Sequence, residues 1–112
     1  MNISDYSTKA ITTLLGSHGL DDIDATLLAQ VLGLVGESGE VAEKFKKLIR
    51  DKHGALSSED KKEIVKELGD VLWYINAVAH LLGSNLEEVA QGNLDKVLSR
   101  KARGVQGGGD NR

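Results

Sequence analysis

The stretch "GLVGESGEVAEKFKK", residues 33–47, has the spacing of a helix, yet it carries glycine at positions 33, 36 and 39. Each glycine inside a helix costs roughly 1 kcal/mol relative to alanine. Two acids, Glu37 and Glu40, lie among these glycines. We interpret the glycines as a slanted strip that lets a neighbouring helix or a bound molecule approach the backbone closely, beside the acids.

The residues just before this stretch extend the same helix. The segment "ATLLAQVLGLV", residues 25–35, is apolar around most of its circumference. A helix of this kind is buried on more than one side. In a chain of 112 residues the second side is expected to meet a partner subunit, so we predict a homodimer or a homotetramer.

The rest of the chain also has helical periodicity, with no alternating run typical of a strand. Ser57 with Asp60, and Ser84 with Glu87, resemble capping boxes that begin two of the helices. The expected helices span residues 4–15, 22–50, 58–82 and 85–102. Short turns between four helices predict an all-α, antiparallel four-helix bundle. We expect one domain, residues 1–103, and a flexible Gly-rich tail, residues 104–112.

Composition excludes several classes of protein. The chain has no cysteine, so it can form neither disulfides nor thiolate metal sites, and this fits the reducing cytoplasm. No apolar run reaches the roughly 20 residues of a membrane span, so no membrane association is expected. The net charge of −3 argues against binding of duplex nucleic acid.

Two pairs of acids are placed beside apolar stripes by the helical step of about 100° per residue. Glu37 and Glu40 share one flank of their helix, and Glu67 and Asp70 share one flank of the next. If the stripes pack together, the four carboxylates converge. The residues expected in the stripes are Leu34, Val41, Phe45 and Leu48; Ile64, Leu68, Leu72, Ile75, Ala79 and Leu82; and, on the last helix, Leu86, Ala90, Leu94 and Val97.

Converging carboxylates repel one another and raise each other's pKa unless a cation neutralises them. Ligands that offer only oxygen select a hard cation, and Mg²⁺ fits best, with Mn²⁺ as a common substitute. The alternative is that the acids are ordinary solvated or ion-paired side chains, as on most helix flanks. The spacing alone does not decide between these two readings.

Three segments together resemble the MazG-like nucleotide pyrophosphohydrolases, a branch of the all-α NTP pyrophosphatases. These segments are "LGLVGESGEVAEKFKK", "KELGDVLWYI" and "NLDKVLSRKARG", and the similarity covers about Tyr6 to Arg103. The family motif, E-x-x-E followed by E-x-x-D, is matched by residues 37–40 and 67–70. The tail resembles the ends of short bacterial and phage members.

The resemblance implies a Mg²⁺-dependent cleavage of a nucleoside triphosphate between its α- and β-phosphates, giving a monophosphate and pyrophosphate, as in cleaning of the nucleotide pool. By the same resemblance Glu37, Glu40, Glu67 and Asp70 are the metal ligands and catalytic residues, with Glu37 or Glu40 as general base. Tyr74 shares the flank of Glu67 and Asp70, whereas Trp73 is expected to point away from it and to pack in an interface or under a base. The expected contacts to phosphate or sugar are Tyr74, Asn93, Lys96, Arg100 and Lys47.

Two other functions remain open from the sequence. The chain could be a non-catalytic helical dimer that binds a nucleotide or another protein. It could also be a related phosphohydrolase that acts on another pyrophosphate compound, such as a phosphoribosyl nucleotide. The absence of a Glu-x-x-His motif argues against a di-iron bundle, and the absence of a GxxxxGK[ST] motif excludes a P-loop.

Overall fold

The computed structural model describes residues 1–15 and 23–104, and within them the chain is all-α with no strand. The helices are α1 (Ile3–Ile11), α2 (Ala25–Lys52), α3 (Ser58–Leu81) and α4 (Leu86–Ala102). All four expected helices are therefore confirmed. The expected Gly-rich tail lies outside the described residues from position 105 onward and stays a prediction.

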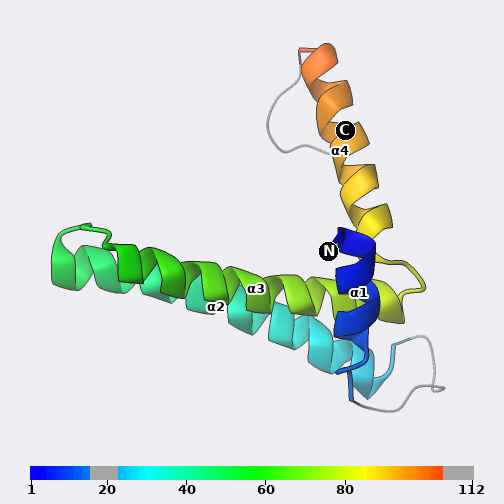
Figure 1. Ribbon diagram of the computed structural model, residues 1–112, viewed down its shortest axis with the longest axis horizontal. Helices are drawn as coiled ribbons and strands as arrows, with labels where there is room; N and C mark the ends of the chain where they lie inside the picture. Colours follow the sequence, from blue (N-terminus) through cyan, green and yellow to red (C-terminus); the bar gives the residue numbers. More distant parts are fainter. Residues whose placement is uncertain (16–22, 105–112) are drawn as a thin grey trace.

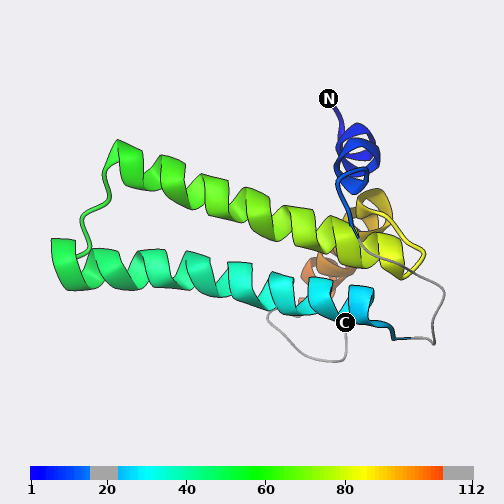
Figure 2. The ribbon, with the colours of Figure 1, turned by 90° about the horizontal axis from the view of Figure 1, so that it is seen from below.

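The two long helices α2 and α3 form an antiparallel hairpin and lie side by side (Figures 1 and 2). Leu48 and Ile64 are buried between them. At the end of α2 the backbone of Gly54 has φ of 82° and its N–H donates to the Leu48 carbonyl at 3.0 Å. A positive φ is readily adopted by glycine, so Gly54 allows the sharp reversal into α3.

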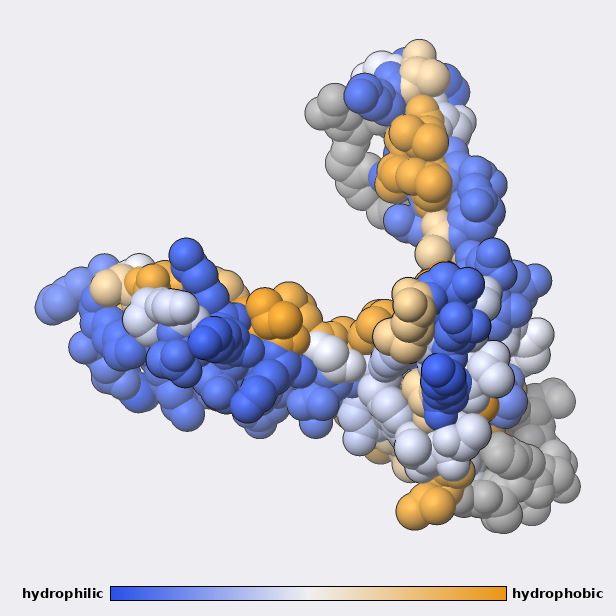
Figure 3. Space-filling view, viewed as in Figure 1, coloured by the Kyte–Doolittle hydropathy of each residue, from blue (hydrophilic) through white to orange (hydrophobic). Residues whose placement is uncertain are grey.

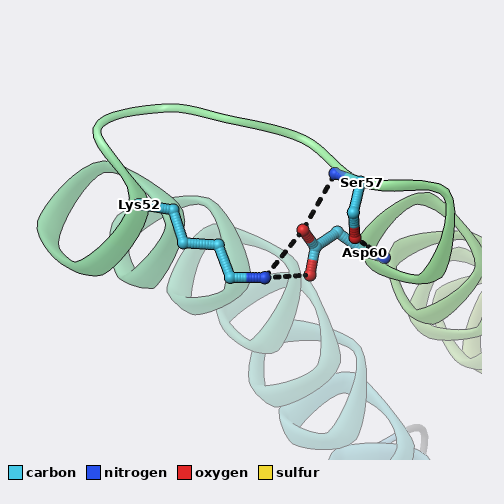
Figure 4. Close-up of polar contacts among 3 residues, drawn as sticks. All are labelled: Lys52, Ser57 and Asp60. Atoms are coloured by element: carbon cyan, nitrogen blue, oxygen red, sulfur yellow. Dashed lines mark hydrogen bonds and ion pairs between the residues drawn. The ribbon is translucent and has the colours of Figure 1, made fainter.

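The start of α3 confirms the expected capping box. The Ser57 hydroxyl accepts from the Asp60 N–H at 3.0 Å, and the Asp60 carboxylate accepts from the Ser57 N–H at 3.0 Å (Figure 4). Lys52, at the end of α2, donates to both oxygens of the same carboxylate. The Ser57 N–H and hydroxyl, followed by Lys52, lower the pKa of Asp60 to about 2.

This lowered pKa predicts an acid-sensitive fold. The carboxylate of Asp60 stabilises the folded chain fully above its ordinary pKa of 3.8, and that contribution disappears as the pH falls through about 2. Urea unfolding at several pH values should therefore show that the free energy of unfolding declines as the pH falls through this window. The decline should be smaller in Asp60→Asn than in wild type. The matched control is Glu59→Gln, which removes the adjacent, more exposed carboxylate and leaves the capping box intact. Equal declines in wild type and Asp60→Asn would contradict the assignment.

The start of α4 differs from expectation by one residue. Asn85, rather than Ser84, is the cap, and its side chain accepts from the Glu88 N–H at 2.9 Å. Ser84 instead donates its hydroxyl to the Glu88 carboxylate at 2.7 Å. Both Ser84 and Asn85 are good capping residues with an acid three positions later, and the choice depends on where the backbone leaves α3.

The short helix α1 packs across α3 and the start of α4. Asn76 of α3, only 1% exposed, holds it by two hydrogen bonds. The Ser7 hydroxyl donates to Asn76 Oδ1 at 2.6 Å, and Asn76 Nδ2 donates to the Ser7 carbonyl at 3.1 Å. A buried amide satisfied in this way fixes the position of α1 on α3.

A single chain does not close the expected four-helix bundle. Among the described residues α4 contacts α1 and α3 but not α2, and it leaves the hairpin at a wide angle (Figure 1). The radius of gyration is 17.0 Å, against about 13 Å for a compact chain of this length. Several residues expected in the core are therefore exposed: Phe45, Leu68, Leu82, Leu94 and Val97.

None of the described helices combines the length and the apolar composition that crossing a membrane would require.

Candidate metal centre

Three carboxylates meet between the middle of α2 and the middle of α3. Glu37, Glu67 and Asp70 each offer an oxygen, and these oxygens all lie within 4.8 Å of one another. The antiparallel pairing of α2 and α3 brings these three residues together. The structure thus supports the expected convergence for three of the four acids.

The carboxylates of the cluster affect one another's ionisation. Partial burial raises the pKa of Glu37, and the negative charges of Asp70 and Glu67 raise it further. A hydrogen bond with Glu67 acts in the same direction. Like charges held this close favour a bound cation, and an all-oxygen donor set suits a hard divalent ion.

Glu40 lies one turn beyond Glu37 on α2. Its side chain is exposed and its oxygens are outside the group of three, although its charge contributes to the raised pKa of Glu37. Glu40 is therefore near the cluster but is not one of its three converging carboxylates.

A hollow of about 320 Å³ opens beside the carboxylates, lined by Glu37, Asp70, Trp73 and Tyr74. The placement of Tyr74 next to the acids agrees with its expected position. Trp73 also lines this hollow, in contrast to the expectation that it points away from the acids. The Trp73 and Tyr74 rings meet edge to face at 5.0 Å, and the indole N–H donates to the Thr13 hydroxyl at 2.8 Å.

Tyr74 owes its position to Gly33. A Cβ added at Gly33 would lie 2.5 Å from Tyr74 Cζ, so the ring occupies the space that any side chain there would need. The close approach expected at this glycine is confirmed. Gly36 and Gly39 have nothing within 4 Å of an added Cβ, so for them close approach by another molecule stays a prediction.

We predict that Gly33→Ala destabilises the fold although alanine is the better helix former. Overpacking against Tyr74 should lower the free energy of unfolding by about 2 kcal/mol. The higher helix propensity of alanine should raise it by about 1 kcal/mol. In a Tyr74→Ala background the same substitution should instead stabilise, which urea unfolding of the four chains would measure. Gly92→Ala is the control, because Gly92 has open space around it. A stabilising Gly33→Ala in the wild-type chain would contradict the contact.

The remaining expected contacts lie apart from the carboxylates within one chain. Asn93, Lys96 and Arg100 belong to α4, which does not touch α2 in the described residues. Asn93 is also exposed, rather than at a core edge as expected. Lys47 lines a second hollow, of about 190 Å³, near the turn between α2 and α3. A single chain therefore assembles the acidic part of the expected site and leaves the basic part elsewhere.

Comparisons with known proteins agree with the resemblance drawn from the motifs. A family model described as "MazG nucleotide pyrophosphohydrolase domain" matches residues 25–105, which include α2, α3 and α4. A protein of Mycobacterium phage L5, named "Gene 37 protein", is 44% identical over 115 aligned positions that span all of both chains. No solved structure matches the chain significantly. The carboxylate cluster and the hollow lie wholly within the matched segment.

Proposed function

The chain belongs to the MazG nucleotide pyrophosphohydrolase family, and we propose that it hydrolyses nucleoside or deoxynucleoside triphosphates between the α- and β-phosphates. Water adds to phosphorus, the bridging P–O bond breaks, and the products are a nucleoside monophosphate and pyrophosphate. The observation that carries the proposal is the cluster of Glu37, Glu67 and Asp70, whose ligand oxygens lie within 4.8 Å of one another.

The residues present fit a hard cation. Three carboxylates offer oxygen donors only. Partial burial, followed by the negative charges of Asp70 and Glu67, raises the pKa of Glu37, and a cation would relieve the repulsion among these charges. We propose that Glu37, Glu67 and Asp70, with Glu40 beside them, hold Mg²⁺, for which Mn²⁺ is a common substitute. When bound, the metal supplies neutralisation of the triphosphate oxygens and polarises the phosphorus under attack.

The side chains around the cluster then have separate tasks. Glu40 is exposed and outside the group of three, so its carboxylate is available to accept the proton of the attacking water. Tyr74 offers its hydroxyl as a donor to a phosphate oxygen at the edge of the hollow. Trp73, held by its hydrogen bond to Thr13, presents an aromatic surface in the same hollow against which a base can pack.

We further propose that the working protein is a homo-oligomer, either a dimer or a tetramer, that acts in the cytoplasm to clear unwanted nucleotides. The support for assembly is the amount of apolar surface that one chain leaves uncovered. Leu32 and Val35 of α2 are 62% and 65% exposed, although they lie in the segment whose pattern predicts burial on two sides.

The test is release of pyrophosphate from a panel of ribo- and deoxyribonucleoside triphosphates with Mg²⁺, for wild type and Glu40→Gln. Product from wild type and a much slower variant are expected. No product from any nucleotide, or equal rates for the two proteins, would refute the proposal. Tight nucleotide binding without product would instead indicate a binding protein. Turnover only of another pyrophosphate compound, such as a phosphoribosyl nucleotide, would indicate the related phosphohydrolase.

A further inference from the structure

The single tryptophan of the chain, Trp73, is held from two sides. Its indole N–H donates to the hydroxyl oxygen of Thr13 at 2.8 Å. The Tyr74 ring meets the indole edge to face, with ring centroids 5.0 Å apart and an interplanar angle of 82°. Tyr74 in turn fills the space beside Gly33. Because a hydrogen bond is directional, the bond to Thr13 restricts rotation of the indole that the ring contact alone would allow.

The hydroxyl of Thr13 has one consistent role in this contact. It donates its own hydrogen to the Ala10 carbonyl at 2.7 Å, so its oxygen is left to accept. An indole N–H is a donor only, and a threonine oxygen can accept while its hydrogen is donated elsewhere. The two bonds therefore run in one direction, from Trp73 to Thr13 and from Thr13 to Ala10.

Thr13 comes from a part of the chain outside the segment that matches the family model. The match covers residues 25–105, and Thr13 directly follows Thr12, the C-cap of α1. None of the α1 residues, all of which the structure describes, is buried. Figure 3 shows a mainly hydrophilic surface over this helix, in contrast to the apolar band on α4. The segment of α1 and Thr13 thus contributes polar contacts to α3 rather than buried apolar side chains.

The docking of α1 does not depend on Thr13. Ser7 and Asn76 exchange two hydrogen bonds, at 2.6 and 3.1 Å, and the Asn76 side chain is almost fully buried. Ser4 also donates its hydroxyl to the Glu87 carboxylate of α4 at 2.8 Å. Loss of the Thr13 hydroxyl should therefore leave α1 in place and release only the indole.

Trp73 lies beside the carboxylates that are proposed to hold the metal. It lines the hollow together with Glu37, Asp70 and Tyr74, and Asp70 is one turn earlier on the same helix. A nucleotide whose phosphates lie at the carboxylates brings its base to the surroundings of the cluster. Bases stack favourably on aromatic side chains. Such a contact is stronger when the ring is already fixed, because immobilising a free side chain on binding lowers affinity.

We propose that Thr13 is a positioning residue for the base of the nucleotide. Its hydroxyl oxygen holds the Trp73 indole in the orientation that stacks against the base, so the ligand does not have to immobilise this side chain itself. The inference rests on the proposed function, because it concerns the base of the same nucleotide. The base is remote from the phosphorus under attack, so the contact is equal in the ground state and the transition state. It therefore acts on KM and not on kcat.

The first experiment measures pyrophosphate release from a nucleoside triphosphate with Mg²⁺. Valine has nearly the shape of threonine but no oxygen, so Thr13→Val should raise KM about 2- to 10-fold and leave kcat unchanged. This range is the one expected when one further side chain must be immobilised on binding. Thr13→Ser keeps the oxygen and should restore KM. An unchanged KM in Thr13→Val would overturn the inference.

The matched control is Thr12→Val, the same change at the neighbouring residue. The Thr12 hydroxyl makes the same kind of bond, to the Lys9 carbonyl at 2.7 Å, whereas the indole N–H of Trp73 donates to Thr13. Thr12→Val should therefore keep the KM of wild type. An equal rise in Thr12→Val and Thr13→Val would mean that the end of α1 acts as a whole, and the role given to Thr13 would be wrong.

A second variant tests whether Thr13 acts through the indole. Phenylalanine keeps an aromatic ring but has no N–H, so Trp73→Phe removes the donor of this hydrogen bond. In the Trp73→Phe background Thr13→Val should raise KM no further, because the two substitutions remove the same interaction. A further rise of the size seen in the wild-type chain would show that Thr13 acts by another route, against the proposal.

The third readout does not depend on activity. Since Trp73 is the only tryptophan, its fluorescence can be followed without background. The decay of its anisotropy should show more rotation of the indole in Thr13→Val than in wild type or Thr12→Val. With Mg²⁺, deoxynucleoside triphosphates carrying a methylene group in place of the α,β-bridging oxygen should quench this fluorescence, whereas inorganic triphosphate, which has no base, should not. Equal rotation in all three chains, or equal quenching by inorganic triphosphate, would contradict the positioning role.

These readouts separate failure of the inference from failure of the function. A chain that releases no pyrophosphate, yet shows base-dependent quenching and a freer indole in Thr13→Val, would support the role of Thr13 and refute the proposed reaction. An active wild type, with the same KM and the same fluorescence in Thr13→Val and Thr12→Val, would refute the role of Thr13 and leave the reaction standing.

Discussion

Replacing Glu67 by glutamine is expected to lower the rate of pyrophosphate release at least about 100-fold. Loss of a residue that only supports a metal ligand already lowers metal affinity or activity about 10- to 100-fold, and Glu67 is proposed to bind the metal directly. Glutamine has the shape of glutamate but lacks the charge that holds a divalent cation. The same variant should be no less stable than wild type in metal-free buffer, since it removes one of three negative groups whose oxygens lie within 4.8 Å. Loss of activity with equal or greater stability is the signature of a site that is strained without its cation.

The measurement pairs initial rates of pyrophosphate release with the midpoint of urea unfolding in the presence of a chelator. Mg²⁺ should raise the midpoint of wild type, because a ligand that binds only the folded chain stabilises it. It should raise the midpoint of Glu67→Gln much less. These readouts together separate a metal ligand from a residue that only supports the fold.

The matched control is Glu63→Gln, the same change one turn earlier on α3. Glu63 is half exposed and pairs with Lys66 at 3.4 Å, outside the group of three carboxylates. Its replacement should leave the rate and the Mg²⁺ effect close to wild type. Similar losses in Glu63→Gln and Glu67→Gln would mean that the general acidity of α3, rather than this cluster, determines the activity.

The helices and the acidic cluster could be predicted because both depend on short-range periodicity. The capping box of Ser57 and Asp60 and the pairing of Glu37 with Glu67 and Asp70 follow from spacing within one helix and antiparallel packing of two neighbours. The start of α4 was misplaced by one residue, because Ser84 and Asn85 are both competent caps. A local pattern cannot choose between adjacent caps when the preceding helix sets the backbone path.

Features that depend on the reach of a side chain or on the relation between distant helices were missed. Trp73 lines the hollow beside the acids although the helical step placed it away from them, because the helical step gives the direction of the Cβ and not the extent of a long side chain. α4 contacts α1 through the hydrogen bond between Ser4 and Glu87, and the periodicity of α4 itself carries no sign of that contact. An apolar stripe predicts burial without saying which chain provides the cover.

Replacing Leu32 by glutamate is expected to separate the assembly into folded monomers. In one chain the side chain of Leu32 is 62% exposed, so the substitution should change the stability of the isolated chain by no more than about 0.5 kcal/mol. In the proposed dimer the same position is covered by apolar side chains of the second copy. An unpaired charge buried there costs several kcal/mol, so dimer dissociation should become at least about 100-fold easier.

Sedimentation at a series of concentrations measures this effect, and circular dichroism checks that the monomers keep their helices. The control is Leu15→Glu, an identical change at a residue that is 85% exposed and lies outside α2, α3 and α4. Leu15→Glu should remain as associated as wild type. Because the homo-oligomer is the proposed working form, Leu32→Glu should also lose activity on dilution and regain it at high protein concentration. A variant that stays fully associated, or that is fully active as a monomer, would show that one chain already contains everything the site requires.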